Sequence, residues 1–124
     1  MSKLENLIKD LKKADKALKE AVSLEPTRIH KDATIQRFEF TFELAWKTAK
    51  EYIRDQGLDC ESPKSCFREA ARLELISNPS KWFDYLRARN LIAHTYNQKT
   101  ADKVYNSAAK FSKEIDGLLK KLSD

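Results

Sequence analysis

Residues 35–53 read IQRFEFTFELAWKTAKEYI, and their spacing decides how the chain folds. At 100° per residue on an α-helix, the apolar side chains of one set fall within an arc of about 120°. They are Ile35, Phe38, Phe42, Ala45, Trp46, Ala49, Tyr52 and Ile53. The pattern predicts a long helix that begins at Thr27 or Arg28 and ends at Gln56. Gly57 supplies the left-handed residue that stops it.

The first half of this helix carries a second apolar face. Phe40 and Leu44 point away from the first set, with Ile29 and Ala33 near them. One face can join the core of the chain, so the other needs a separate cover. We expect a second copy of the chain to provide it, which makes the protein a homodimer. The alternative is that a loop or the short third helix covers Phe40.

Four further helices are predicted from apolar stripes with a 3.6-residue period and from capping residues. The expected ranges are Ser2–Ser23, a short helix that Ser62 and Pro63 open and that fades at Ile76, Pro79 to Ala93 or His94, and a last helix that Thr100 caps and that runs to Leu122. Two glycines and three prolines leave little material for strands. The chain is therefore predicted to be all-α, an antiparallel four-helix bundle with one additional short helix, in a single domain over residues 1–124.

The composition favours anionic partners. The chain has 24 Lys and Arg against 19 Asp and Glu, a formal net charge of +5. Nucleotides and nucleic acid fit that balance, although a lysine-rich solvated surface explains it equally well. No signal peptide or membrane-spanning run is apparent, so a cytoplasmic location is expected. Cys60 and Cys66 have no zinc-site spacing and suggest no disulfide framework.

Asp15 falls inside the apolar stripe of the first helix. It either serves a buried cation as a partner or occupies a partly exposed edge of the stripe. We favour the edge position. His30, one of the two histidines, is assigned no role because no matching partners surround it in the sequence.

Residues 89–96 read RNLIAHTY and hold the other histidine. Trp82, Leu86, Arg89 and Ala93 recur at the spacing of one helical stripe. A guanidinium cannot lose its charge, so Arg89 on an apolar stripe needs a partner or a wet cleft. This conflict between pattern and chemistry marks the stretch as a candidate site.

The residue types of this stretch suit a phosphodiester or a nucleotide. Arg89 offers a planar fork for phosphate, and His94 can move a proton near neutral pH. Asn90 could orient His94, and Tyr96 offers a hydroxyl that binds or accepts a transferred group. No metal or cofactor is required. Arg89 and His94 diverge by about 140° on an ideal helix, so either the helix unwinds after Ala93 or a second protomer completes the site. The alternative is a structural network at a helix end.

At these residues the chain resembles the HEPN superfamily, whose mark is an arginine, a polar residue, a short spacer and a histidine. Residues 89–94 match that mark, and His94-Thr95-Tyr96 adds a His-x-Tyr extension. The extension and residues 35–47 resemble the branch called nucleotidyltransferase substrate-binding proteins, also described as the toxin half of a bacterial toxin–antitoxin pair. The resemblance covers nearly the whole chain.

The resemblance implies an all-α homodimer whose partner is a minimal nucleotidyltransferase. We therefore expect a dimeric nucleotide- or substrate-binding subunit for that enzyme. The alternative is a metal-independent ribonuclease that cleaves RNA, with Arg89 and His94 as catalytic residues. In that toxin branch, the partner silences the protein by adding nucleotide to Tyr96.

Overall fold

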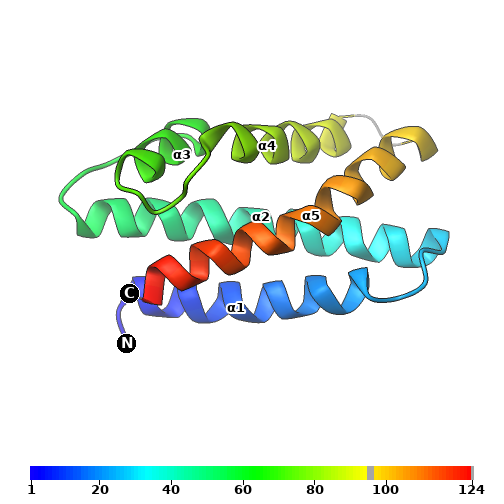
Figure 1. Ribbon diagram of the computed structural model, residues 1–124, viewed down its shortest axis with the longest axis horizontal. Coiled ribbons are helices and arrows are strands. Elements are labelled where there is room, and N and C mark those ends of the chain that lie inside the picture. The colour runs from blue at the N-terminus through cyan, green and yellow to red at the C-terminus, as the bar shows by residue number, and fades with distance from the viewer. Residues whose placement is uncertain (95–96, 124) are drawn as a thin grey trace.

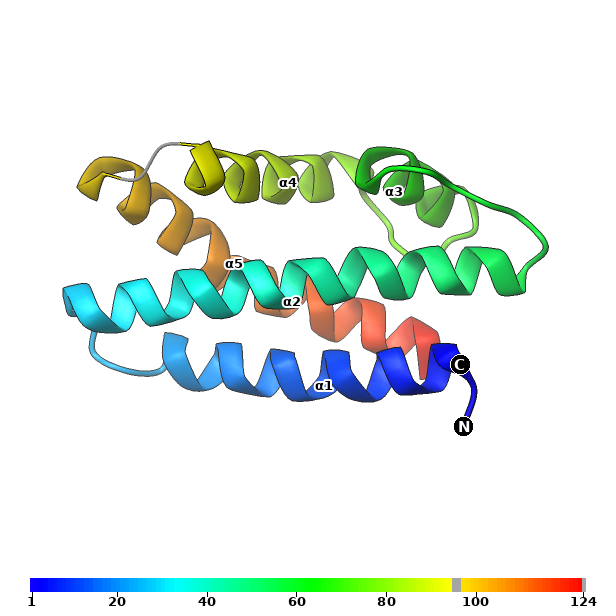
Figure 2. The same ribbon diagram turned by 180° about the vertical axis from the view of Figure 1, so that it is seen from behind.

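The computed structural model describes residues 1–94 and 97–123, and its regular elements are all helices. They are α1 (Lys3–Val22), α2 (Arg28–Asp55), α3 (Pro63–Arg72), α4 (Pro79–His94) and α5 (Gln98–Ser123). Figures 1 and 2 show α1 and α2 side by side and antiparallel, with α3 and α4 following one another along the opposite edge of the molecule. α5 crosses obliquely and packs on α1, α2 and α4. No strand occurs within the described residues, and the predicted all-α class is confirmed.

Local signals set the helix ends. Ser2 and Glu5 form a capping box at the start of α1, and Gly57 takes the left-handed conformation after α2, with φ of 82°. Two predicted ends are wrong. The Asn97 side chain, not Thr100, caps α5, because Asn97 Oδ1 accepts a hydrogen bond from the Thr100 N–H at 2.8 Å.

The second wrong end is that of α3, which stops at Arg72 rather than near Ile76. Glu74 takes a left-handed conformation with φ of 62°. Its N–H donates to the Ala71 carbonyl, and the Leu75 N–H donates to the Ala70 carbonyl. This is a Schellman ending, which satisfies the last carbonyls of the helix and turns Leu75 and Ile76 into the core.

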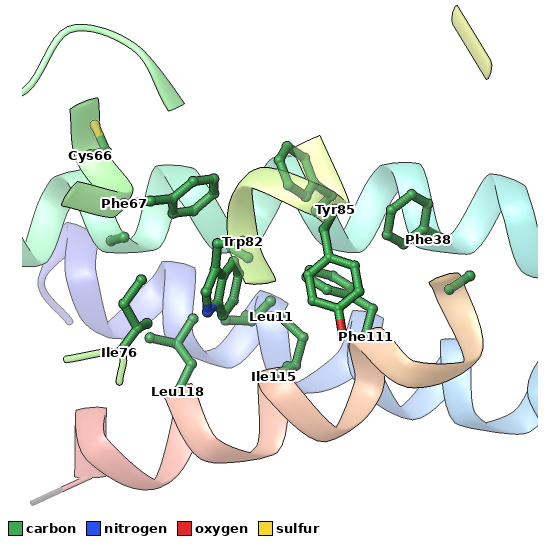
Figure 3. Packing of buried hydrophobic residues seen from close by; sticks show 14 of the residues in the cluster. Leu11, Phe38, Cys66, Phe67, Ile76, Trp82, Tyr85, Phe111, Ile115 and Leu118 are labelled. Carbon is green, nitrogen blue, oxygen red and sulfur yellow. The ribbon is translucent and has the colours of Figure 1, made fainter. Parts of the chain in front are cut away.

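The core is built around Trp82, the largest fully buried side chain (Figure 3). Its ring centroid lies 5.1 Å from that of Phe67 on α3 and 5.4 Å from that of Phe111 on α5. Phe38 of α2 packs edge-on against the same Phe111 at 5.2 Å. These rings fix the rotation of α4 about its own axis and therefore which side of α4 faces α2.

The predicted stripe of α4 is rotated from its buried face. The buried side chains of α4 are Trp82, Tyr85 and Ile92, whereas Ala93 is exposed. Tyr85 takes the centre of the face because its ring packs 4.8 Å from that of Phe111. Arg89 consequently lies at the edge of the core, with its side chain 33% exposed.

Asp15 is buried, so the predicted exposed edge position is wrong. Its carboxylate accepts a hydrogen bond from Ser112 Oγ of α5 at 2.8 Å and lies 3.1 Å from Lys19 Nζ. α5 packs directly over this part of α1 and excludes water from the carboxyl group. Burial, and then the neighbouring Asp116, raise the pKa of Asp15.

Cys60 and Cys66 form a disulfide that the sequence did not suggest. It closes the connection between α2 and α3 onto the first turn of α3. Both cysteines are buried beside the core. The bridge thus ties the start of α3 to the loop before it.

The second apolar face of α2 is open. Phe40 is 64% exposed and Ile29 is 78% exposed, so neither a loop nor α3 covers Phe40. Beside Phe40, a groove of about 640 Å³ runs between α1 and α2, with Ala14, Ala17 and Leu44 among its lining residues. Within the described residues, no helix combines the length and apolar character needed to cross a membrane.

Candidate functional site

Arg89 is held at the edge of the core by a carboxylate on α2. Its Nη2 lies 2.8 Å from Glu43 Oε1, and the other oxygen of Glu43 accepts a hydrogen bond from Trp46 Nε1 at 2.7 Å. The guanidinium also lies over the Phe42 ring, with Cζ 6.0 Å from the ring centroid. The partner that an arginine in this position needs is therefore Glu43, and the Trp46 bond fixes where that carboxylate points.

A second carboxylate, Glu39, lies one helical turn before Glu43 on α2. Partial burial raises the pKa of Glu39, and the positive charge of Arg89 opposes that rise. Arg89 thus neutralises an otherwise acidic stretch of α2. An approaching phosphate meets the guanidinium together with two carboxylates, so the site favours a ligand that makes further contacts.

Asn90 and His94 stand on the solvent side of α4. Arg89 Nη1 donates to Asn90 Oδ1 at 3.2 Å, which links the core-edge arginine to the exposed surface. His94 is exposed, and its ring forms no hydrogen bond or ion pair within residues 1–94 and 97–123. α4 continues through His94, so the helix does not unwind after Ala93 as one of our two expectations required. Completion by a second protomer stays a prediction, and so does the alternative of a structural network at the helix end.

The structure thus brings Arg89 and Asn90 together and leaves His94 on a diverging side of α4. Tyr96, expected to bind ligand and to accept a transferred group, lies outside the described residues. His30 lies in the first turn of α2, where its Nδ1 is 2.6 Å from the Glu25 carbonyl oxygen in the loop before the helix.

Arg89 keeps donors for a ligand. A guanidinium carries five N–H groups in a fixed fork, and the described residues use two of them, one toward Glu43 and one toward Asn90. The described residues contain no cluster of three or more His, Cys, Asp or Glu side chains arranged to hold a metal ion. The arrangement can bind an anion through Arg89 and exchange a proton through His94.

Sequence reasoning missed Glu43, which holds Arg89, and the neighbouring residues Glu39 and Trp46. Glu39, Glu43 and Trp46 lie on α2, and Glu43 is 46 positions before Arg89. Their spacing did carry a signal, because Glu39 and Glu43 are one turn apart on one side of α2, next to the buried Phe42. That pairing becomes meaningful only once the packing of α4 against α2 is known.

Comparisons with known proteins agree on one family. The family described as nucleotidyltransferase substrate binding protein like matches residues 2–124. A curated relative from Haemophilus influenzae, named probable ribonuclease HepT, is 37% identical over 93 residues. That match covers 71% of this chain and 64% of the relative, so the chain spans less than two thirds of the relative's length.

Two solved structures share the fold over most of the chain. A crystal structure of a Thermus thermophilus protein has a TM-score of 0.86 and 32% identity, and the match covers 92% of this chain and 99% of that one. A Haemophilus influenzae structure, described as revealing the fold of a substrate-binding domain of a nucleotidyltransferase, has a TM-score of 0.78 and 29% identity, with 94% and 99% coverage. These matches confirm the family resemblance, and the chain belongs to the HEPN/nucleotidyltransferase substrate-binding protein family.

Proposed function

We propose that the chain is a homodimeric subunit that binds RNA or a nucleotide at Arg89, Asn90 and His94 and that partners a minimal nucleotidyltransferase. The unit of assembly is a four-helix-bundle protomer comprising residues 1–124. The family description and the substrate-binding role printed for the Haemophilus influenzae structure support the partnership. The binding site is proposed from the state of Arg89. Glu43 positions its guanidinium, and three of its five N–H groups form no hydrogen bond to the described residues.

The open face of α2 supports the homodimer. Phe40 and Ile29 expose large apolar side chains that a monomer would leave in water. Phe40 is three positions before Glu43 and shares that side of α2 with it. A second copy seated on Phe40 would therefore lie beside Arg89 and could bring its own His94 to the same ligand.

The partnership is tested by co-expressing the chain with a minimal nucleotidyltransferase from the same genome. We expect one complex on gel filtration and an intact mass raised by whole nucleotide units, with no such rise in Tyr96→Phe. A chain that elutes alone and keeps its unmodified mass would argue against the partnership and against Tyr96 as the acceptor.

A second candidate function is metal-independent cleavage of RNA, favoured by the name of the curated relative and by an arginine and a histidine on one helix end. In this reaction His94 removes the proton of a 2′-hydroxyl, and that oxygen attacks the adjacent phosphorus. The bond to the 5′-oxygen breaks, which leaves a 2′,3′-cyclic phosphate, and the leaving oxygen takes up a proton from water. Arg89 stabilises the charge that develops on the phosphoryl oxygens.

Mixed dimers test whether Arg89 of one protomer acts with His94 of its partner. Arg89→Met and His94→Ala should each be inactive alone. After the two are unfolded and refolded together, we expect about one quarter of wild-type cleavage, because half of the dimers are mixed and each keeps one intact site of two. Equal cleavage by wild type and His94→Ala would rule the candidate out, and no recovery on mixing would place both residues in one protomer.

A further inference from the structure

A row of exposed or half-buried side chains runs along α4 from α3 toward His94. Phe83, Arg87, Asn90 and His94 are spaced at i, i+4, i+7 and i+11, so they share one side of the helix. Arg87, Asn90 and His94 are exposed, and Phe83 is half-buried. The row is about 16 Å long at a rise of 1.5 Å per residue. None of these four side chains belongs to the buried face of α4.

Two cations of α3 stand at the Phe83 end of the row. Lys64 Nζ lies 5.4 Å from the Phe83 ring centroid, and Arg68 Cζ lies 5.6 Å from it. Both side chains are exposed, and neither pairs with a carboxylate in the described part of the chain. The aromatic ring therefore holds two unneutralised charges in place.

The row is rigid at its α3 end. The Cys60–Cys66 disulfide and the Ser62 cap fix the first turn of α3, and Phe67 packs against Trp82 of α4. α3 and α4 follow one another along one edge of the molecule (Figure 1). Lys64 and Arg68 are therefore placed relative to the α4 row by packed structure rather than by a loop.

We propose that Lys64, Arg68, Phe83, Arg87 and Asn90 form a track for the backbone of single-stranded RNA that leads to His94. This rests on the proposed function, because it extends the ligand site at Arg89 and His94. Phosphates meet Lys64 and Arg68 first, and Arg87 follows one turn further along α4. Arg87 is paired with Asp84, so its charge contributes less than the two cations of α3.

Because the track is long, RNA probes of two lengths can distinguish binding along the track from binding at the Arg89 and His94 site alone. About 16 Å corresponds to about five stacked nucleotides at 3.4 Å each. A trinucleotide seated at Arg89 and His94 does not reach Lys64 or Arg68, whereas an octanucleotide does. The two probes are 2′-O-methyl oligouridines, which cannot be cleaved because the attacking hydroxyl is blocked.

The test compares the two probes by fluorescence anisotropy on wild type, on Lys64→Gln/Arg68→Gln and on the control Lys12→Gln/Lys16→Gln. The control removes the same charge from exposed positions of α1. We expect the α3 double variant to bind the octanucleotide about tenfold more weakly and the trinucleotide as wild type does. Its slope of log affinity against log salt should be shallower by about 1.4, which is two phosphate contacts on a single strand. The control variant should bind both probes with nearly wild-type affinity.

Phe83→Leu keeps every charge and removes the ring that holds them. We expect octanucleotide affinity to fall about twofold to fivefold, the range for exposed cation–π contacts. An equal loss in the α1 control, or no loss in the α3 variant while wild type binds both probes, would overturn the track and leave the proposed function standing. Wild type that binds neither probe would overturn both. An α3 variant that binds RNA normally but no longer joins the nucleotidyltransferase would show a protein-docking surface instead.

Discussion

Arg89 combines a fixed charge, a position at the edge of the core and a partly exposed side chain. Glu43, itself 33% exposed, holds it through one ion pair. Ion pairs with this degree of exposure contribute about 1 kcal/mol or less to stability, because water screens them. The pair therefore positions the guanidinium more than it stabilises the fold.

Replacing this charge should leave the fold almost unchanged. We expect Arg89→Met to change the free energy of unfolding by less than about 1 kcal/mol, since the methionine stem still packs on Phe42. RNA or nucleotide binding should fall at least tenfold in the same variant. Urea denaturation and anisotropy titration measure the two effects separately. A variant that binds normally would support the interpretation of Arg89, Asn90 and His94 as a structural network only.

Glu43→Gln is the matched control for Arg89→Met. The amide oxygen can still accept the hydrogen bond from Trp46 Nε1, while the ion pair to Arg89 is lost. The guanidinium then keeps its charge and loses its restraint. Binding weaker than wild type but stronger than in Arg89→Met would show that Glu43 acts by orienting Arg89.

At the scale of helices, the contact of α1 with α5 contains two neighbouring carboxyl groups, Asp15 and Asp116. Asp15 is deeply buried, accepts from Ser112 and lies near Lys19, and Lys19 Nζ also lies 2.5 Å from Asp116 of α5. Burial is the largest cause of the raised pKa of Asp15, and the nearby Asp116 carboxylate adds to it. The folded protein thus keeps a proton on Asp15 at a pH where the unfolded chain has released it. Partial burial favours a higher pKa for Asp116, but its hydrogen bonds to Asp15 and Lys19 outweigh that burial, so the pKa of Asp116 is lowered.

Stability should therefore depend on pH through Asp15. Between the unfolded pKa of an aspartate, about 3.9, and the raised folded pKa, the folded state binds more protons, so acidification through this window favours folding. Asp15→Asn has no carboxyl group to titrate at this position. As the pH rises from this window to about 7, wild type should therefore lose free energy of unfolding that the variant keeps. Urea unfolding at several pH values measures it, with the exposed Glu20→Gln on the same helix as control. Parallel pH profiles of wild type and Asp15→Asn would contradict this account.

The disulfide at the start of α3 should stabilise the folded state. It closes a short loop, with the two cysteines six positions apart. Closing a loop of this size lowers the conformational entropy of the unfolded chain, which stabilises the folded state by about 2 kcal/mol. Adding a phosphine reductant should lower the free energy of unfolding by that amount in wild type and have no effect in Cys60→Ala/Cys66→Ala. Identical unfolding curves with and without reductant in wild type would contradict this.

The helices themselves follow from local sequence. The apolar period of α2, the capping box of α1 and the Ser62-Pro63 start of α3 each act within one or two turns, and the structure has all three. The motif residues Arg89, Asn90 and His94 were likewise identified from local pattern. These features are predictable because their causes lie close together in the chain.

Pairings between distant helices could not be predicted in the same way. Glu43 with Arg89 and Ser112 with Asp15 join residues far apart in sequence, and each depends on how a helix is rotated in the core. The predicted buried face of α4 is rotated for the same reason, because Tyr85 is buried against Phe111 while Leu86 is only partly buried. Which of the charged side chains find partners is a property of the packing, not of one helix.

At the scale of the whole molecule, one face of α2 has no cover within the described chain. Phe40 and Ile29 are exposed there, and the groove between α1 and α2 runs beside Phe40. We propose that a second copy covers this face and completes the ligand site that Arg89 and His94 cannot form on diverging sides of one helix. Assembly and ligand binding should then be lost together.

Sedimentation velocity with a labelled 2′-O-methyl octauridine measures both properties in one experiment. Phe40→Lys should sediment as a folded monomer and bind the RNA at least tenfold more weakly than dimeric wild type, although the added positive charge alone would strengthen attraction to RNA. The control Leu58→Lys, at an exposed apolar position after α2, should remain a dimer and bind normally. A Phe40→Lys protein that stays dimeric, or that binds RNA with wild-type affinity as a monomer, would contradict the claim.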